Sequence, residues 1–378
     1  MLKPPPLALY VHIPWCVRKC PYCDFNSHQA TGDLPEAEYV RALLADLDSE
    51  RDRAGGRRFG SVFIGGGTPS LFSAQAIGAV LEAAERRIGL APGAEITLEA
   101  NPGTADADRF RGYRAAGVNR LSIGVQSFAD AQLASLGRIH SGGEAARAFE
   151  LARAAGFENI NLDLMHCLPD QTPAQAVADL QQAIALAPEH LSWYQLTIEP
   201  NTLFYRKPPR LPDESVLDDI HTAGTTLLAR AGYRQYEVSA YARDGRHGRH
   251  NVNYWEFGDY IGIGAGAHGK LTDAEAGAVR RRRKVRHPRE YLARSDDRCA
   301  EQVTLNAADL PLEFLLNALR LNAGVPTHYF AERTNQPLAA IAQPWDDLVR
   351  QGLVAPLSDR LATTPTGHRF LDSVLAAF

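Results

Sequence analysis

The sequence lacks any long apolar run. Its longest apolar stretches are strand-length and are broken by Gly, Pro or charged residues, whereas a membrane-spanning helix needs about 20 consecutive apolar residues. The first residues, MLKPPPLALY, contain neither the apolar segment of a secretory signal nor an Arg-rich amphipathic leader. We therefore expect a cytoplasmic protein with at most peripheral membrane contact.

Cysteine is scarce, and charge of one sign is not in excess. The chain has 5 cysteines, an odd number that does not suit a secreted disulfide framework and indicates a reducing compartment. A net charge of −4 argues against a dedicated nucleic-acid binder. With 378 residues, 45% hydrophobic and 22% charged, the chain has an ordinary globular composition and the length of about two domains.

Three of the cysteines lie together near the start of the chain. Cys16, Cys20 and Cys23 form a C-x3-C-x2-C loop directly after an apolar run that predicts a buried strand. Three thiolates on one loop can bind three irons of a 4Fe–4S cluster and leave the fourth iron open to another ligand. The alternatives are inert buried thiols or a structural zinc site, which normally takes four ligands in two separated pairs. No second cysteine pair occurs in the sequence.

Apolar, β-branched runs alternate with helix-patterned stretches through the first half of the chain. The predicted strands are 7–13, 61–65, 95–100, 120–125, 159–164 and 191–198. The predicted helices between them are 35–53, 73–89, 106–116, 143–155 and 173–187. Near-continuous apolar strands that alternate with helices predict an α/β fold with a parallel sheet. Such a sheet carries its chemistry at the carboxyl ends of the strands.

Polar or glycine-rich motifs follow the predicted strands at these ends. The GGGTP segment, 65–69, predicts either a tight turn or an anion-binding nest of backbone N–H groups. Taken alone, Glu99 indicates the start of a helix, Gln126 a turn contact and Arg138 a solvated side chain. Asp163 is unusual, because a carboxylate within an apolar strand is unfavourable to bury unpaired. We expect it to face a ligand or a basic partner such as Arg138.

In order and spacing, these fragments resemble one family. YVHIPWC, CPYCDF, GGGTP, EANP, GVQSF, LGRIH and NLDLMHCLP are similar to motifs of the oxygen-independent coproporphyrinogen oxidase branch of the radical S-adenosylmethionine (SAM) superfamily. The resemblance runs over essentially the whole chain. It implies an incomplete (β/α)6 radical SAM barrel followed by a smaller, mainly helical C-terminal domain.

The resemblance also implies residue roles. The three cysteines would bind a 4Fe–4S cluster whose open iron is chelated by SAM. The residues implied to contact SAM or to line its pocket are Tyr10, Gly66, Gly67, Thr68, Glu99, Gln126, Arg138 and Asp163. An electron donor would reduce the cluster, and SAM would be cleaved to methionine and a 5′-deoxyadenosyl radical.

Two features separate the chain from the catalytic oxidase. The oxidase pattern continues to a fourth cysteine where this chain has Phe25, and the oxidase has a longer extension before its first strand. Both differences argue against oxidative decarboxylation of coproporphyrinogen III, which remains the alternative function.

Residues 250–255 read HNVNYW. Histidine is a common axial ligand of haem iron, and Tyr and Trp can pack on a porphyrin face, but a lone histidine is more often a satisfied structural residue. HNxxYW is similar to the motif of HemW-type haem chaperones, radical SAM proteins that bind haem and pass it to haem-requiring proteins. The resemblance implies haem contact at His250, Asn251, Tyr254 and Trp255. It implies haem-acceptor proteins as partners and leaves both a monomer and a homodimer open.

Three later segments complete the sequence. IGIGAGAHG, 261–269, predicts a tight turn rather than a nucleotide-binding loop. RRRRK, 280–284, predicts a solvated basic face; haem propionates, an anionic membrane or an acidic acceptor protein are the functional alternatives. The C-terminal region predicts a winged-helix-like unit without a basic recognition segment, so we do not expect DNA binding. We divide the chain into a barrel with the cluster and SAM sites (1–235), a connecting segment (236–300) and a C-terminal domain (301–378).

Overall fold

The six predicted strands lie side by side at the centre of one sheet. The structure is a computed structural model and describes residues 1–243 and 245–378. The central strands are β1 (Leu7–Ile13), β4 (Phe59–Gly66), β5 (Leu90–Ala100), β6 (Arg120–Gln126), β7 (Ile160–His166) and β8 (His190–Gln195). Each pairs in parallel with the next. Their carboxyl ends therefore meet along one edge, as the sequence predicted.

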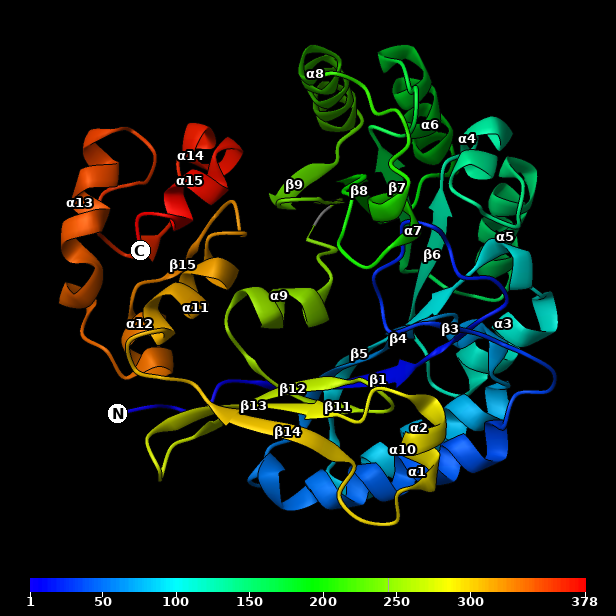
Figure 1. Ribbon diagram of the computed structural model, residues 1–378, viewed down its shortest axis with the longest axis horizontal. Coiled ribbons are helices and arrows are strands. Elements are labelled where there is room, and N and C mark those ends of the chain that lie inside the picture. The colour runs from blue at the N-terminus through cyan, green and yellow to red at the C-terminus, as the bar shows by residue number, and fades with distance from the viewer. Residues whose placement is uncertain (244) are drawn as a thin grey trace.

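Helices connect these strands and cover the outer face of the sheet (Figure 1). They are α1 (Glu36–Glu50), α2 (Ala74–Arg87), α3 (Ala107–Ala115), α4 (Asp130–Ser135), α5 (Gly142–Ala154) and α6 (Pro173–Leu186). Two more helices follow β8: α8 (Glu214–Arg230) packs beside α6, and α7 (Leu203–Arg206) lies against Pro21, whose carbonyl accepts a hydrogen bond from the Phe204 N–H at 3.0 Å. Short 3-10 turns lie at Arg51–Ala54, Pro69–Leu71 and Pro102–Thr104. The five helices expected from periodicity are all present as α1, α2, α3, α5 and α6.

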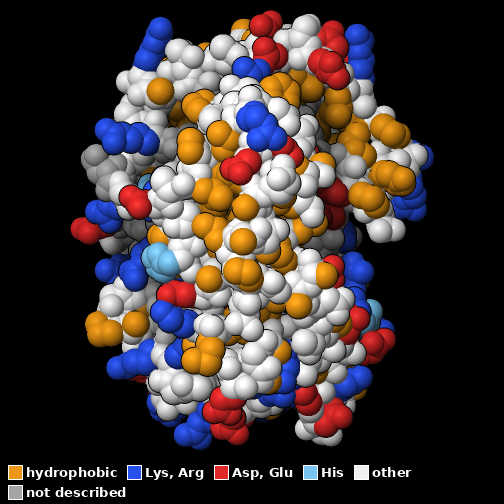
Figure 2. Space-filling view, turned by 90° about the vertical axis from the view of Figure 1, so that its left-hand side faces the viewer, with side chains coloured by type: hydrophobic (Ala, Val, Ile, Leu, Met, Phe, Trp, Pro, Cys, Tyr) orange, Lys and Arg blue, Asp and Glu red, His pale blue; other side chains and the backbone are white. Residues whose placement is uncertain are grey.

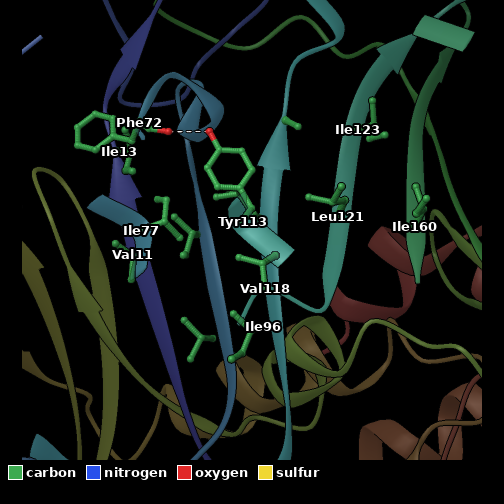
Figure 3. Close-up of a cluster of buried hydrophobic side chains, with 14 of the residues drawn as sticks. Val11, Ile13, Phe72, Ile77, Ile96, Tyr113, Val118, Leu121, Ile123 and Ile160 are labelled. Atoms are coloured by element: carbon green, nitrogen blue, oxygen red, sulfur yellow. Dashed lines mark hydrogen bonds between the residues drawn. The ribbon is translucent and has the colours of Figure 1, made fainter. Parts of the chain in front are cut away.

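The hydrophobic core fills the space between the sheet and these helices. Figure 3 shows Val11 of β1 and Ile96 of β5 in one cluster with Ile77 of α2 and Tyr113 of α3. The Tyr113 hydroxyl donates to the Phe72 carbonyl at 2.6 Å, so the buried phenol is satisfied. Because side chains alternate along a strand, the register that buries this set turns the intervening residues to the concave face.

The sheet extends beyond the six parallel strands. At one edge β10 (Ala240–Ala242) and β9 (Arg234–Glu237) add antiparallel to β8. At the other edge β11 (Asp259–Ile263) pairs in parallel with β1, and β12 (His268–Asp273), β13 (Ala278–Lys284) and β14 (Cys299–Thr304) follow antiparallel. The predicted connecting segment, 236–300, is therefore built into the 12-stranded sheet. The division into three units stays a prediction.

The C-terminal region is mainly helical, as expected. It contains α11 (Leu310–Ala318), α12 (His328–Thr334), a 3-10 turn (Leu338–Ile341), α13 (Ala342–Arg350), α14 (Pro365–Arg369) and α15 (Leu371–Leu375), with a two-stranded wing of β15 (Val325–Pro326) and β16 (Arg360–Leu361). Its core around Trp345 and Phe314 also includes Tyr236, Phe257 and Val279. The unit is thus packed onto the sheet through a shared core.

Figure 2 shows the molecule from the side of these C-terminal helices. Hydrophobic side chains run down the middle of this face, and basic and acidic side chains are interspersed around them. None of the helices in the described ranges is both long enough and apolar enough to cross a membrane.

Candidate functional site

The three clustered cysteines lie on a loop that a short pair of strands closes at its base. β2 (Trp15–Cys16) pairs with β3 (His28–Gln29). All three thiols are free and part-buried, and burial raises the pKa of Cys16 and Cys23. Within the described part of the chain, no group of three or more His, Cys, Asp or Glu side chains is arranged so that it could hold a single metal ion. A 4Fe–4S cluster does not require such an arrangement, because each thiolate binds its own iron.

The GGGTP segment packs against the base of this loop. The N–H groups of Gly67 and Thr68 donate to backbone carbonyls there, each at 2.7 Å, and the Gly66 N–H donates to Glu99 at 3.0 Å. Gly66 has a φ of +119°, and a Cβ on it would lie 2.6 Å from the His12 ring. Of the two alternatives, these contacts favour the tight turn over the anion-binding nest, because protein acceptors occupy the N–H groups of Gly66, Gly67 and Thr68. The glycines instead allow the end of β4 to approach the cysteine loop closely.

Glu99 lies near the carboxyl end of β5. Burial raises its pKa to about 8, and the nearby Asp163 carboxyl adds to this, whereas the Gly66 N–H acts in the opposite direction. Tyr10, on β1, has its pKa raised by burial and then by Glu99, and its hydroxyl is hydrogen-bonded to His12 Nδ1 at 2.9 Å. The centre of the concave face therefore holds an enclosed, largely protonated carboxyl beside a neutral phenol.

Gln126 ends β6 in the left-handed conformation, with a φ of 68°. The sheet register shifts between Gly124 and Gln126, so the residue lies at a bulge that re-aims its side chain. Its Oε1 accepts a hydrogen bond from the Tyr194 hydroxyl at 2.7 Å. Such a conformation is rare for a residue other than glycine and is concentrated at functional sites.

Asp163 does not pair with Arg138, the basic partner considered for it, but it does face a cavity, the other alternative that we expected. Asp163 accepts hydrogen bonds from the Ser122 hydroxyl and the Asn161 amide, both at 2.8 Å. Arg138 Nη1 instead lies 3.8 Å from Cys20 Sγ, and its Nε is buried without a partner among the described residues. The Arg138 guanidinium therefore lies directly beside the Cys20 sulfur.

These residues surround one cavity of about 410 Å³, which we call the cysteine cavity. The predicted residues on its wall are Cys16, Cys20, Cys23, Gly66, Gly67, Thr68, Glu99, Gln126, Arg138 and Asp163. Tyr10 lies outside it and lines a second cavity, which shares Gly66 and Glu99 with the first. The cysteine cavity has the size of an ordinary small-molecule site.

Other residues of the cysteine cavity were not predicted. The added polar side chains are Arg120, Ser122, Asn161, His190, Ser192 and Tyr194. They lie on the concave face of β6, β7 and β8. Alternation within those strands is the one signal that could have found them, because every second residue of a strand faces the same side.

Two carboxyls of this wall, those of Glu99 and Asp163, can take part in binding a cationic small molecule, while Arg120 and Arg138 line the same wall. Glu99 accepts a hydrogen bond from the Gly66 N–H, Asp163 accepts from Ser122 and Asn161, and burial raises the pKa of both carboxyls. A bound cation would favour the ionised form of each carboxyl. The arrangement can therefore hold a positively charged molecule beside three thiol ligands.

Comparisons with known proteins agree on the family. Residues 10–183 match the model of the radical SAM superfamily, and residues 305–370 match that of the HemN C-terminal domain. The chain is 52% identical over 379 residues to the haem chaperone HemW of Escherichia coli K12, across 100% of this chain and 99% of that protein. This chain belongs to the HemW family. The HemW of Haemophilus influenzae is 48% identical over 382 residues, across 100% of this chain and 99% of that protein.

The HemW-family fold also has a counterpart among solved structures. The coproporphyrinogen III oxidase HemN from Escherichia coli, a radical SAM enzyme, aligns with a TM-score of 0.82 over 99% of this chain and 90% of that chain. Their sequence identity is 22%, so this likeness concerns the fold alone. It confirms the predicted partial barrel with a C-terminal domain.

The HNxxYW motif forms a short helix, α9 (Arg249–Trp255), on the concave side of the sheet. His250 is 1% exposed. Its Nδ1 is hydrogen-bonded to the Ser61 hydroxyl at 3.0 Å and its Nε2 to the Tyr254 hydroxyl at 2.8 Å. Burial lowers the pKa of His250 to about 3, so the ring is neutral. In this conformation His250 is a satisfied buried residue that holds Tyr254 in place.

The other three motif residues have separate surroundings. Asn251 lines the cysteine cavity and Tyr254 lines the second cavity. Trp255 lies under the Arg320 guanidinium, 4.2 Å from it. The motif therefore does not present one continuous face, and haem contact at these four residues stays a prediction.

The basic run 280–284 is only partly the solvated face that we expected: Arg280, Arg281 and Arg283 are partly exposed, whereas Arg282 and Lys284 are buried. It forms β13, and each residue is ion-paired: Arg280 with Asp273, Arg281 with Glu313, Arg282 with Asp297, Arg283 with Glu301, and Lys284 with Asp46 and Glu50. The Lys284 side chain is 2% exposed. The difference arises because alternate residues of a strand face opposite sides of the sheet. Acidic side chains of other elements form ion pairs with the basic residues on both sides.

Proposed function

We propose that this protein is a haem chaperone, which binds haem and passes it to haem-requiring acceptor proteins. The observation that carries the proposal is the 52% identity, over the full chain, to a protein named haem chaperone HemW. The presence of Phe25 at the end of the cysteine loop, where the related oxidase pattern has a fourth cysteine, supports the same conclusion.

The cysteine cavity is proposed to hold a 4Fe–4S cluster and SAM. Cys16, Cys20 and Cys23 are the three thiolate ligands, and the enclosed carboxyl of Glu99 faces the cationic SAM. When bound, a 4Fe–4S cluster and SAM supply one-electron reduction of the sulfonium, with an external electron donor. Arg138 contacts the Cys20 sulfur, and the bulge at Gln126 directs an amide into the cavity.

The proposal includes the location and partners of the chain. A cluster on three free thiolates requires a reducing compartment, which is consistent with the cytoplasm. The expected partners are haem, an acceptor protein and an electron donor.

The alternative function is oxygen-independent dehydrogenation of coproporphyrinogen III. The observation in its favour is the fold shared with HemN at a TM-score of 0.82. Both functions use the same cofactors, so cluster assembly alone does not distinguish them.

The test uses one anaerobically reconstituted sample of the full chain. Haem is titrated and the Soret band is followed to saturation; a parallel reaction receives coproporphyrinogen III, SAM and reductant and is analysed for decarboxylated product. We expect stoichiometric haem binding and no product. Product formation would establish the alternative, and an unsaturable Soret signal would refute haem binding as a specific property.

A further inference from the structure

The second cavity, of about 530 Å³, lies beside the cysteine loop and adjoins the cysteine cavity, with which it shares Phe25, Gly66 and Glu99. Its wall combines elements far apart in the chain: Tyr10 from β1, Tyr254 from α9, Tyr260 from β11, His268 from β12 and Arg283 from β13. Its volume falls within the range of ligand sites. It differs from the cysteine cavity in the aromatic and basic character of its wall.

His268 is the free imidazole of this wall. It is exposed at the first position of β12, and among the described residues its ring makes no hydrogen bond. His12, on the same wall, has Nδ1 bonded to Tyr10 and Nε2 bonded to the Asn26 carbonyl at 2.9 Å. His268 is thus available to a ligand in a way that His12 is not.

The protonation state of His268 suits metal ligation. Although the residue is exposed to solvent on one side, partial burial at the cavity wall lowers the pKa of His268, and the positive charges of Arg283 and Arg281 lower it further, against an opposite effect of Glu301. The neutral imidazole therefore predominates at neutral pH, and this is the form that binds iron.

Aromatic rings supply flat apolar surface next to this imidazole. Tyr254 and Tyr260 are in edge-to-face contact, with ring centroids 4.5 Å apart, and His250 fixes Tyr254 through its hydroxyl. Phe25 is 58% exposed and lines both cavities. Rings of this kind pack favourably against a large planar molecule.

Two arginines mark the rim. Arg283 lies opposite His268 in the β12–β13 register, and Arg286 is exposed two residues beyond the end of β13. The Arg283 guanidinium is ion-paired with Glu301 at 3.0 Å. Asp24 also lines this cavity. Guanidinium groups in this position can bind a pair of carboxylates.

We propose that the second cavity is the haem-binding site, with His268 as the iron ligand, the rings of Tyr254 and Tyr260 against the macrocycle and Arg283 and Arg286 on the propionates. This assignment rests on the proposed function. It gives the HNxxYW motif a positioning role, in which His250 holds Tyr254 rather than binding the iron itself.

The experiment compares His268→Ala with His328→Ala in the reconstituted full chain. His328 is exposed on α12 and lines neither cavity. We expect His268→Ala to shift the Soret maximum and to weaken haem binding at least about tenfold, which corresponds to roughly 1.4 kcal/mol, while His328→Ala behaves as wild type. Iron and sulfide content and the melting temperature show that each variant is folded.

A second variant tests the rim without touching the iron ligand. Arg283→Glu combined with Arg286→Glu should weaken haem and metal-free protoporphyrin IX alike, with an unchanged Soret position for bound haem. If His268→Ala binds haem with the affinity and spectrum of His328→Ala, the site assignment is overturned and the chaperone function stands. If the wild-type protein binds no haem, the proposed function is overturned and this assignment with it.

Discussion

Cys20 differs from the other two clustered cysteines in having a guanidinium beside it, that of Arg138 at 3.8 Å. Burial raises the pKa of Cys16 and Cys23. Metal ligation requires thiolates, so binding of iron at Cys16 and Cys23 has to offset the burial of charge.

The first prediction concerns this loop. Replacing any one of Cys16, Cys20 or Cys23 with Ser should abolish the cluster, because each is the sole thiolate for one iron. Iron and acid-labile sulfide are measured after anaerobic reconstitution. Cys299→Ser is the matched control, since Cys299 is also free and part-buried but lines neither cavity. An equal loss in the Cys299 variant would contradict the ligand assignment.

The second prediction concerns Glu99. Glu99→Gln keeps the shape of the side chain and removes the charge that a cationic ligand would favour, so SAM affinity should fall by about tenfold or more. Calorimetry on cluster-loaded protein measures it. Glu82→Gln, on the exposed surface of α2, is the control. An unchanged affinity with the cluster intact would remove Glu99 from the SAM site.

At the scale of elements, the pattern of apolar residues predicted the strands in the parallel half of the sheet. β1 was predicted with its observed bounds, 7–13, because a continuous apolar run buried on both faces has few alternatives. β13 could not be predicted in the same way. Its residues 280–284 are all basic, and they form a strand only because Asp46, Glu50, Asp297, Glu301 and Glu313 lie beside them in the fold.

Asp259, at the start of β11, joins three elements. It is fully buried and accepts hydrogen bonds from Lys270 Nζ at 2.9 Å, Arg57 Nη1 at 2.7 Å and the Thr272 N–H at 2.9 Å. Burial alone would raise its pKa, but Lys270, the Thr272 N–H and Arg57 outweigh this effect and the pKa of Asp259 is lowered. Its stabilising contribution is therefore complete above the unfolded-state value, near pH 4, and is lost as the pH falls through the lowered pKa.

The third prediction follows from this network. Asp259→Asn should lower the free energy of unfolding at pH 7 by about 3 kcal/mol, because Lys270 is left buried without its counter-charge. The variant should also lose less stability than wild type when the pH falls below about 4. Urea unfolding at several pH values measures both effects. Asp296→Asn, at an exposed position, is the control, and parallel pH profiles for wild type and Asp259→Asn would contradict the assignment.

At the scale of the whole molecule, α9 stands between the sheet and the C-terminal helices (Figure 1). Trp255 at its end packs under Arg320, and Arg320 also donates to Glu237 of β9 at 3.1 Å. The C-terminal domain is thereby attached to the helix that positions Tyr254. The order of motifs predicted that the site residues would meet at the carboxyl ends of the strands. The packing of α9 against the C-terminal domain could not be predicted, because it depends on contacts between residues far apart in the sequence.

The fourth prediction tests this attachment. Arg320→Ala removes a cation–π contact and a partly buried ion pair, which together contribute about 1–2 kcal/mol. Amide hydrogen exchange should become about tenfold faster in α9 and α11 and stay unchanged in β4 to β7. Arg350→Ala, which removes an exposed pair with Asp347, is the control. Uniform acceleration across the sheet would indicate global destabilisation instead.

Phe25, Gly66 and Glu99 belong to the walls of both cavities. Because these residues separate the two cavities and line both, ligand binding in one cavity is thermodynamically coupled to ligand binding in the other. A ligand in one cavity that fixes the charge or position of Glu99 changes the affinity of the other cavity, and the second ligand acts on the first by the same factor. A carrier must release its cargo as well as bind it, and this partition provides a direct physical route by which occupancy on one side alters retention on the other.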